Sequence, residues 1–235
     1  MTTQTLNGIW NYRIGKGKQR SVCVPFSASP VGHSECARSF DLEHSGKQVF
    51  LKFDGITYQA SVHLNGAELG QMLPYSEYTF DVTDLVRERD NQLTVEIEDL
   101  SPRFGPTEGW ENFGGIIRDV YLQYAEENYI ADVTFQSTLL HDYQDARFTV
   151  KTVSARNRGV FQIALFFENT QVCCFTQDAQ TGSQEQTICE VHLWSPEQPN
   201  LYRLEVTLLD NGSPVVPASA MWVSGNSPKS ATVFC

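Results

Sequence analysis

The stretch Ala60-Ser61-Val62-His63-Leu64-Asn65-Gly66 decides the fold class. Its apolar residues alternate with polar ones at a period of two, which is the pattern of a β-strand with one buried face. The pair Asn65-Gly66 follows at once, and both residues tolerate a positive φ, so the pair predicts a tight hairpin turn. The stretch therefore predicts two antiparallel strands joined by a short turn.

The same alternation recurs on both sides of this hairpin. It is present from Val49 to Phe53, from Leu93 to Ile97 and from Val120 to Leu122. A helical turn is plausible only from Thr83 to Arg87, which is too short to be more than a connector. Short strands at regular spacing, joined by turns, indicate a β-sandwich or jelly roll.

A second series of strand patterns begins near Ile130, after the polar link Glu126-Glu127-Asn128. About seven short strands in roughly 100 residues is the pattern of an immunoglobulin-like sandwich, although the Cys…Trp…Cys spacing of antibody domains is missing. We therefore predict an all-β protein of two domains. A jelly-roll β-sandwich is expected at residues 1–126, an immunoglobulin-like β-sandwich at 129–216 and an irregular tail at 217–235.

Charge and composition narrow the range of partners. The chain has 235 residues, of which 41% are hydrophobic, and a formal net charge of −11. An acidic chain repels phosphate backbones and anionic lipid, so we expect neither nucleic acid nor a membrane surface as a partner. No run approaches the roughly 20 apolar residues of a membrane span. The first ten residues lack the basic and apolar regions of a secretory signal.

Cysteine usage points to a reducing compartment. The spacing of the six cysteines fits neither a zinc motif nor a C-x-x-C redox pair. Cys173 and Cys174 are adjacent, so on a strand they would face opposite sides. We expect free, mostly buried thiols and a cytoplasmic location. The six are Cys23, Cys36, Cys173, Cys174, Cys189 and Cys235.

Motifs of a self-sufficient catalytic site are absent from the sequence. There is no H-E-x-x-H metal motif and no G-x-S-x-G nucleophile elbow. Gly15-Lys16-Gly17 lacks the other residues of a nucleotide-binding loop, so we interpret it as a solvated hairpin tip. Asn211-Gly212-Ser213 is formally a glycosylation acceptor, but we interpret it as a turn. The sequence therefore predicts no catalytic residue, no metal ligand and no cofactor.

Four stretches, taken in order, resemble glycoside hydrolase family 2, which includes β-galactosidases, β-glucuronidases and β-mannosidases. They are Leu6 to Trp10 with Val24-Pro25, Phe53 to Gly66 continued by Tyr78 to Val95, Gly114 to Leu122, and Leu193 to Tyr202. The resemblance implies a galactose-binding-like jelly roll, an immunoglobulin-like domain and a (β/α)₈ barrel that carries two catalytic glutamates. A barrel needs about 250 residues, and none remain after the second sandwich. The resemblance thus implies the non-catalytic N-terminal region of a retaining O-glycosidase.

The matched residues also have plain structural interpretations. Trp194 would fill the core of the second sandwich or pack on the surface between the domains. Arg118 would pair with an acidic neighbour and fix two strands together. Asn65-Gly66 would only make a turn.

The resemblance places a sugar-contacting loop just before the Gly-Ile-x-Arg segment that ends at Arg118. An Asp of that loop often contacts the sugar in intact relatives, and its position falls on Gly109 here. Trp110, Glu111 and Asn112 lie beside it as candidate substitutes. An aromatic face stacks on a pyranose, and Glu and Asn exchange hydrogen bonds with hydroxyls. The alternative is a loop tip that docks on the barrel.

A second, weaker candidate for sugar binding is the loop with His33 and Glu35. The expected partners are a β-glycoside or oligosaccharide, bound weakly if at all, and a catalytic barrel. Two other functions stay open at this point: a stand-alone carbohydrate-binding module and an interaction scaffold. The sequence does not separate these three.

Overall fold

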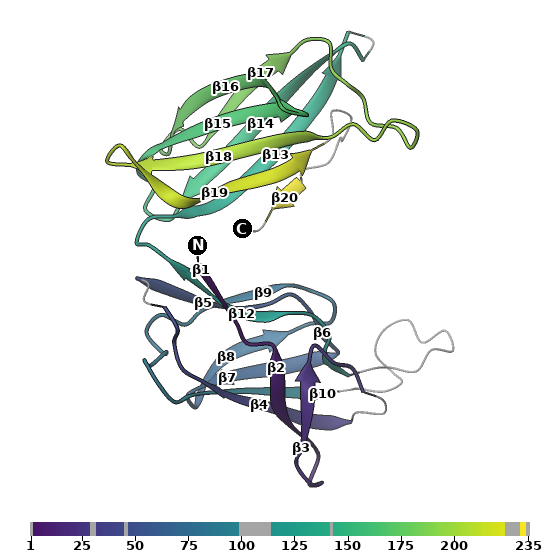
Figure 1. The fold of residues 1–235 in the computed structure, drawn as a ribbon, viewed down its shortest axis with the longest axis vertical. Coiled ribbons are helices and arrows are strands. Elements are labelled where there is room, and N and C mark those ends of the chain that lie inside the picture. Colours follow the sequence, from purple (N-terminus) through teal and green to yellow (C-terminus); the bar gives the residue numbers. More distant parts are fainter. Residues whose placement is uncertain are drawn as a thin grey trace. The chain divides into compact units, whose positions relative to one another are not determined.

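The computed structural model is built from β-strands grouped in two units, Met1–Ala125 and Glu126–Cys235 (Figure 1). It describes residues 2–28, 32–44, 47–98, 114–141, 143–223 and 231–233. Within these residues, no helix is long and apolar enough to cross a membrane. The predicted all-β class is confirmed.

The first unit is a sandwich of two antiparallel sheets. Its larger sheet contains β2 (Gly8–Ile14), β3 (Arg20–Val24), β4 (His33–Phe40), β7 (Gln59–Leu64), β8 (Ala67–Met72) and β10 (Asn91–Glu98). These strands lie in the order β3-β2-β4-β10-β7-β8. Its smaller sheet contains β1 (Thr2–Thr5), β5 (Gln48–Phe53), β9 (Tyr78–Asp81) and β12 (Val120–Ala125). Their order is β1-β12-β5-β9, and two short strands, β6 (Ile56–Thr57) and β11 (Gly115–Ile116), pair with each other.

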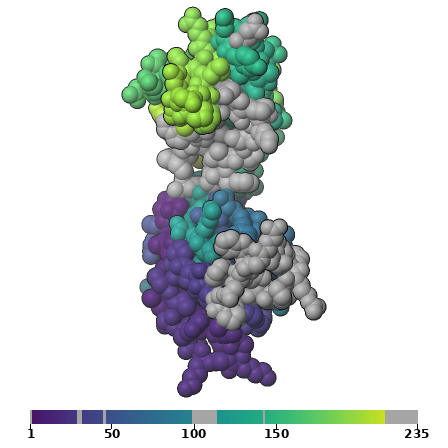
Figure 2. Space-filling model, turned by 90° about the vertical axis from the view of Figure 1, so that its right-hand side faces the viewer, coloured from purple at the N-terminus to yellow at the C-terminus, as the bar shows by residue number. Residues whose placement is uncertain are grey.

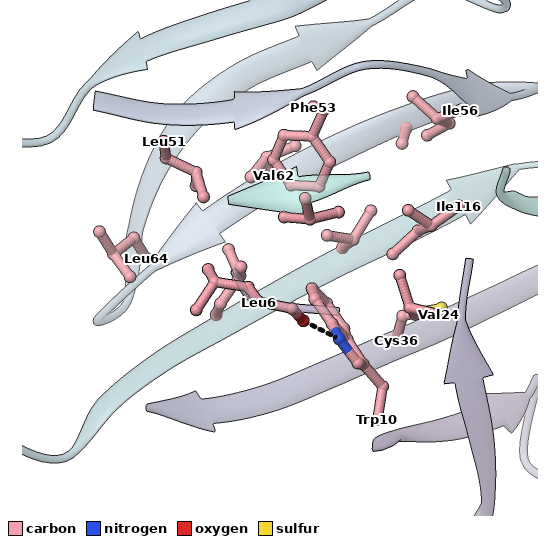
Figure 3. Close-up of a cluster of buried hydrophobic side chains, with 14 of the residues drawn as sticks. Leu6, Trp10, Val24, Cys36, Leu51, Phe53, Ile56, Val62, Leu64 and Ile116 are labelled. Carbon is pink, nitrogen blue, oxygen red and sulfur yellow. Dashed lines mark hydrogen bonds between the residues drawn. The ribbon is translucent and has the colours of Figure 1, made fainter. Parts of the chain in front are cut away.

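Alternate residues of both sheets form the core of this unit. Figure 3 shows Leu51 and Phe53 of β5 together with Val62 of β7 and Trp10 of β2, all of them buried. Burying one such side chain contributes roughly 1.5–3 kcal/mol to stability. The indole Nε1 of Trp10 donates a hydrogen bond to the carbonyl of Leu6 over 2.8 Å. The polar atom of the largest core residue therefore has a partner, as a buried N–H requires.

The predicted Asn-Gly turns are confirmed. Asn65 and Gly66 have φ of 53° and 87°, and the residues that flank them, Leu64 and Ala67, pair across the hairpin. The two positive φ values suit a two-residue hairpin. A second Asn-Gly turn, at residues 211–212, has the same signs of φ.

The Asn65 side chain does more than make the turn. Its Nδ2 donates to the carbonyl of Leu85 over 2.8 Å and to Oδ1 of Asn91 over 3.0 Å, and its Oδ1 accepts from the backbone N of Gln92 over 2.9 Å. One amide thereby joins the β7–β8 hairpin to the turn after β9 and to the start of β10.

Gly15-Lys16-Gly17 forms the tip of the hairpin between β2 and β3, as predicted. The backbone N of Gly17 donates to the carbonyl of Ile14 over 2.8 Å, and the tip is exposed. In Figure 2 this purple segment projects from the first unit.

The second unit is a sandwich of two four-stranded sheets. One sheet contains β13 (Ile130–Leu140), β14 (Asp145–Ser154), β17 (Ser183–Ile188) and β20 (Ala231–Val233), in the order β17-β14-β13-β20. The other contains β15 (Val160–Phe167), β16 (Thr170–Asp178), β18 (Tyr202–Asp210) and β19 (Ser213–Val223), in the order β16-β15-β18-β19. Phe148 and Phe161 are the largest fully buried side chains of its core. This architecture is the immunoglobulin-like sandwich expected from the strand series.

The tail differs from the irregular segment expected from residue 217 onward. β19 continues to Val223 alongside β18, and β20 pairs with β13. The register between β18 and β19 shifts between Val206 and Leu208, so Pro217 falls in a bulge. Bulges accommodate proline within a strand, and they interrupt the alternation on which the sequence prediction depended.

The expectation of mostly buried cysteines was wrong. Of the five cysteines that the structure describes, all of them free thiols, Cys36 alone is buried, and Cys23, Cys174 and Cys189 are exposed. Cys23 and Cys174 occupy outward positions of their strands. Cys173 is half-buried beside the exposed Cys174, as their adjacency predicted.

Trp194 does not fill the core of the second sandwich. It is 40% exposed and forms an isolated β-bridge with Pro199. The backbone N of Ser195 donates to the carbonyl of Gln198 over 2.9 Å. The Trp-Ser-Pro segment is therefore a surface turn before β18.

Candidate functional site

One end of the first sandwich gathers several strand ends, among them the start of β4 with the candidate residue His33. β10 ends at Glu98, which pairs with His33 at the start of β4 and with Gln59 at the start of β7. β5 ends at Phe53, opposite the start of β9. The loops 54–58, 73–77 and 117–119 lie at this end, which we call the loop end. Segments far apart in the sequence thus supply one surface.

The three candidates Trp110, Glu111 and Asn112 lie outside the described residues. The last described residue before them is Glu98, and the first after them is Gly114. The backbone of Gly114 exchanges two hydrogen bonds of 2.9 Å with Ala28. The described chain on both sides of the candidates therefore belongs to the loop end.

His33 and Glu35 share the outward face of β4 but bind different partners. Nδ1 of His33 lies 3.8 Å from Oε1 of Glu98, and both side chains are exposed. Oε2 of Glu35 accepts a 3.0 Å hydrogen bond from Arg13. Exposed ion pairs of this kind contribute about 0–1 kcal/mol. His33 thus keeps hydrogen-bonding capacity at the loop end, while the carboxylate of Glu35 is already paired.

Tyr121 and Asp54 form a polar pair that the sequence did not predict. Partial burial raises the pKa of Tyr121 to about 12, and the Asp54 carboxylate, which accepts its hydroxyl proton in a hydrogen bond, adds to the rise. The charges of Glu77 and Asp119 act in the same direction. The phenol therefore stays protonated beside a group of carboxylates. Tyr121 and these carboxylates come from three separate segments of the chain, so no local sequence motif predicts the group.

The opening Asn-Gly motif has a structural role at the loop end. Nδ2 of Asn7 donates to Oδ1 of Asp119 over 2.9 Å, and its Oδ1 accepts from the backbone N of Val120 over 3.0 Å. The guanidinium of Arg38 donates to the Asn7 carbonyl over 2.6 Å, and burial lowers the pKa of Arg38. Gly8 has a φ of 109°. The motif fastens the link between β1 and β2 to the start of β12.

Arg118 acts by packing. A Cβ at Gly55 would lie 3.0 Å from the Cδ of Arg118, so the glycine makes room for the arginine stem. Among the described residues, no carboxylate lies within ion-pair distance of Arg118, in contrast to the acidic partner that was expected. The two motifs Phe-Asp-Gly and Gly-Ile-x-Arg therefore fit together through a glycine and a side-chain stem.

The loop 73–77 presents apolar side chains to solvent. Tyr75 is 68% exposed and Leu73 is 52% exposed. The backbone N of Tyr75 donates to the carbonyl of Ile56 over 2.9 Å, and its ring lies edge-on to that of Tyr58, with centroids 6.3 Å apart. Sequence reasoning missed this feature because the loop has no periodicity.

The loop end offers the groups that bind a hydroxyl-rich ligand: carboxylates, a protonated phenol, an imidazole and an exposed aromatic ring. Within the described ranges, no group of three or more His, Cys, Asp or Glu residues is arranged to hold a metal ion. The arrangement therefore supports ligand contact through hydrogen bonds and stacking.

Two family models match the chain in order. Residues 33–104 match the galactose-binding domain-like model of glycosyl hydrolase 2, and residues 128–217 match the model of glycosyl hydrolases family 2. A β-galactosidase of Clostridium acetobutylicum is 29% identical over 212 residues, covering 82% of this chain and 22% of that protein. A β-glucuronidase of Bacteroides fragilis is 27% identical over 252 residues, covering 89% of this chain and 36% of that protein.

Solved structures agree on the fold. The crystal structure of Bacteroides uniformis β-glucuronidase superposes with a TM-score of 0.83 at 19% identity, covering 95% of this chain and 32% of that one. An FMN-binding β-glucuronidase from Facaelibacterium prausnitzii L2-6 gives a TM-score of 0.83 at 20% identity, covering 95% and 39%. The chain thus spans well under half the length of these relatives.

Proposed function

Because the chain belongs to glycosyl hydrolase family 2, we propose that it is the non-catalytic N-terminal region of a retaining O-glycosidase. Its loop end supports and partly lines an active site that a (β/α)₈ barrel completes. The observation that carries this proposal is the ordered match of both family models to a chain that covers 22% and 36% of two enzyme relatives. The remaining length of such relatives exceeds the roughly 250 residues of a barrel.

The position of the candidate residues supports a lining role for the loop end. His33 and the described residues that flank Trp110 to Asn112 lie at the same end of the sandwich as Asp54 and Tyr121. An imidazole, a phenol and carboxylates exchange hydrogen bonds with sugar hydroxyls, and an indole stacks on a pyranose. Relatives named β-galactosidase and β-glucuronidase make a β-glycoside the substrate class that we propose.

We also propose a cytoplasmic location. The support is that the five described cysteines are free thiols and three of them are exposed. Exposed thiols persist in a reducing compartment.

The test of the main proposal uses the purified chain and its gene. Incubation with nitrophenyl β-galactoside and nitrophenyl β-glucuronide should release no nitrophenol above buffer. Sequencing beyond the codon of Cys235 should reveal a reading frame for a (β/α)₈ barrel. Hydrolysis that follows the protein through several chromatographic steps would contradict the non-catalytic role. A downstream sequence without a barrel would contradict the role as an enzyme region.

A further inference from the structure

β16 is an edge strand of the second sandwich (Figure 1). It comes first in the order β16-β15-β18-β19, and β15 is the only described strand that pairs with it. β17, which follows it in the chain, pairs with β14 in the other sheet. Among the described strands, none therefore pairs with β16 on the side that faces away from β15. The unpaired backbone N–H and C=O groups of such an edge are a template for a further strand.

The backbone groups on this free side include those of Cys174 and Thr176. The backbone N of Ala179 donates to the carbonyl of Gly159 over 3.0 Å, so Ala179 faces β15. The backbone direction alternates along a regular antiparallel strand, and the register with β15 stays constant back to Cys173. Every second residue before Ala179 therefore also faces β15. Cys174 and Thr176 lie between these residues and direct both N–H and C=O away from β15, and both residues are exposed.

The composition of β16 favours pairing with an identical strand. Residues 170–177 include no charged residue, no proline and no glycine. The valine, phenylalanine and threonines of this run are strong strand formers. Uncharged segments of this length and composition are the ones that pair with copies of themselves. The chain has a net charge of −11, but Asp178 is the first acidic residue within the strand. Two copies of β16 can therefore approach each other without placing carboxylates face to face.

The other edge strands carry features that oppose such pairing. Four of them contain a charged residue: Arg20 in β3, Glu68 in β8, Asp81 in β9 and Glu185 in β17. β19 contains Pro214 and Pro217, and β1 and β20 are only four and three residues long. Charges, prolines and short length all limit the addition of a strand at an edge. β16 has nine residues and a charge only at its last position.

A bulge restricts the regular part of the β16 edge. The register with β15 shifts between Leu165 and Phe166, which leaves Val172 without a partner on β15. A bulge bends its strand and interrupts the ladder, and edge bulges limit pairing in the same way. A second strand therefore fits the segment that begins at Cys173.

A two-fold axis at Phe175 makes this segment complementary to itself. It places Cys174 of each copy opposite Thr176 of the other, and each such pair exchanges both of its N–H···O=C bonds. Asp178 then falls opposite the uncharged Val172, so no like charges are opposed. The same patch serves both copies, as a two-fold interface requires.

We propose that β16 pairs antiparallel with β16 of a second copy of this chain, which joins two four-stranded sheets into one continuous sheet. The pairing rests on the second unit alone and is independent of the proposed role beside a barrel. A single added strand buries less than the roughly 800 Å² per partner of a standard interface, so we expect a weak and reversible dimer.

Sedimentation velocity of the full 235-residue chain tests the pairing. Concentrations from about 10 µM to about 1 mM cover the range in which a small interface associates, and a reductant prevents disulfides between exposed thiols. We expect a monomer that converts to a dimer as the concentration rises. Thr176→Lys places a positive charge on the free edge of both copies and should raise the dissociation constant of the dimer by about tenfold or more. Cys174→Lys should have the same effect.

Thr187→Lys provides the matched control. Thr187 is an exposed threonine of β17, an edge strand of the other sheet, so its replacement adds the same charge to the same unit. The dissociation constant of the dimer should stay as it is in the original chain. Thermal melting of each variant shows that it is folded.

Amide hydrogen exchange identifies the paired edge by a separate measurement. Pairing turns the free N–H groups of Cys174 and Thr176 into hydrogen-bond donors, so their exchange should slow as the protein concentration rises, while that of Thr187 stays constant. The proposal is overturned by a monomer throughout the concentration range, by a Thr176→Lys variant that dimerises as tightly as the original chain, or by an equal weakening in Thr187→Lys.

Discussion

Nδ2 of Asn7 donates a hydrogen bond of 2.9 Å to Oδ1 of Asp119, although 112 residues separate the two in the sequence. The same Asn7 side chain accepts the backbone N of Val120, so it holds the N-terminal strand to the start of β12. The opening stretch from Asn7 to Trp10 thereby has an architectural role.

Replacing Asn7 by Ala should destabilise the first unit by about 1–3 kcal/mol. The substitution removes the bond to Asp119 and leaves the partly buried N–H of Val120 without its acceptor. Urea unfolding followed by Trp fluorescence measures the change. Gln19→Ala, at an exposed position of the hairpin tip, is the control and should stay within about 0.5 kcal/mol of the original chain. Equal stability of the two variants would refute the role assigned to Asn7.

Comparing Asn65→Gly with Asn211→Gly isolates the side-chain bonds of Asn65. Glycine fits the positive φ at both turns, so the backbone of each hairpin is preserved. Asn65→Gly removes three hydrogen bonds and should cost about 2–3 kcal/mol. Asn211 makes no side-chain hydrogen bond within the described residues, so Asn211→Gly should change stability by a few tenths of a kcal/mol. Denaturant unfolding of each unit decides, and similar costs at both turns would contradict the prediction.

The cysteines should differ in their reaction with iodoacetamide. Burial raises the pKa of Cys36 to about 12, with the charge of Glu35 adding to the effect. The thiolate is the reactive form, so Cys36 should stay unlabelled in the native protein at pH 8, whereas Cys23 and Cys174 are labelled. Peptide mass spectrometry identifies each site, and labelling in denaturant provides the reference for complete reaction. Native labelling of Cys36 as fast as that of Cys23 would be incompatible with its burial.

Acid should weaken the second unit through Asp210. Hydrogen bonds from Asn128 and Arg158, together with the charge of Arg158, hold the pKa of Asp210 below its ordinary value of 3.8. A carboxyl with a lowered folded-state pKa contributes stability above its unfolded pKa, and this contribution is lost as the pH falls through the folded value. Asp210→Asn should therefore flatten the decline in stability below about pH 4.

Denaturation of this variant at several pH values tests the assignment. Glu168→Gln, at an exposed turn of the same unit, is the control and should leave the acid dependence as it is. If the stability of Asp210→Asn falls with pH as steeply as that of the original chain, the protonation of other carboxyl groups causes the loss of stability in acid.

The strands in which apolar and polar residues alternate regularly were predictable from the sequence. Alternation in β7 and β10 identified their buried faces, because a strand repeats every two residues. The tail was missed because the bulge at Pro217 breaks that period. The exposure of Cys23 was also missed, since its residue type favours burial while its register places it outward.

The candidate site was less predictable. His33 was proposed from its loop, yet its proximity to Glu98 depends on the register between β4 and β10. The Asp54–Tyr121 pair joins segments separated by more than sixty residues, so only the pairing of β5 with β12 brings it together. Tyr75 is exposed and has a φ of 60°, neither of which its residue type reveals.

The shared amide of Asn65 has a consequence for motion within the first unit. From its hairpin it contacts two other segments at once, the turn after β9 and the start of β10. Asn91, one of its partners, is itself buried and donates to the carbonyl groups of Phe40 and Arg87. Opening the hairpin alone would leave the buried Asn91 without part of its hydrogen bonding, which is costly. The hairpin, the turn after β9 and the first residues of β10 should therefore open together, as a single cooperative unit in amide hydrogen exchange.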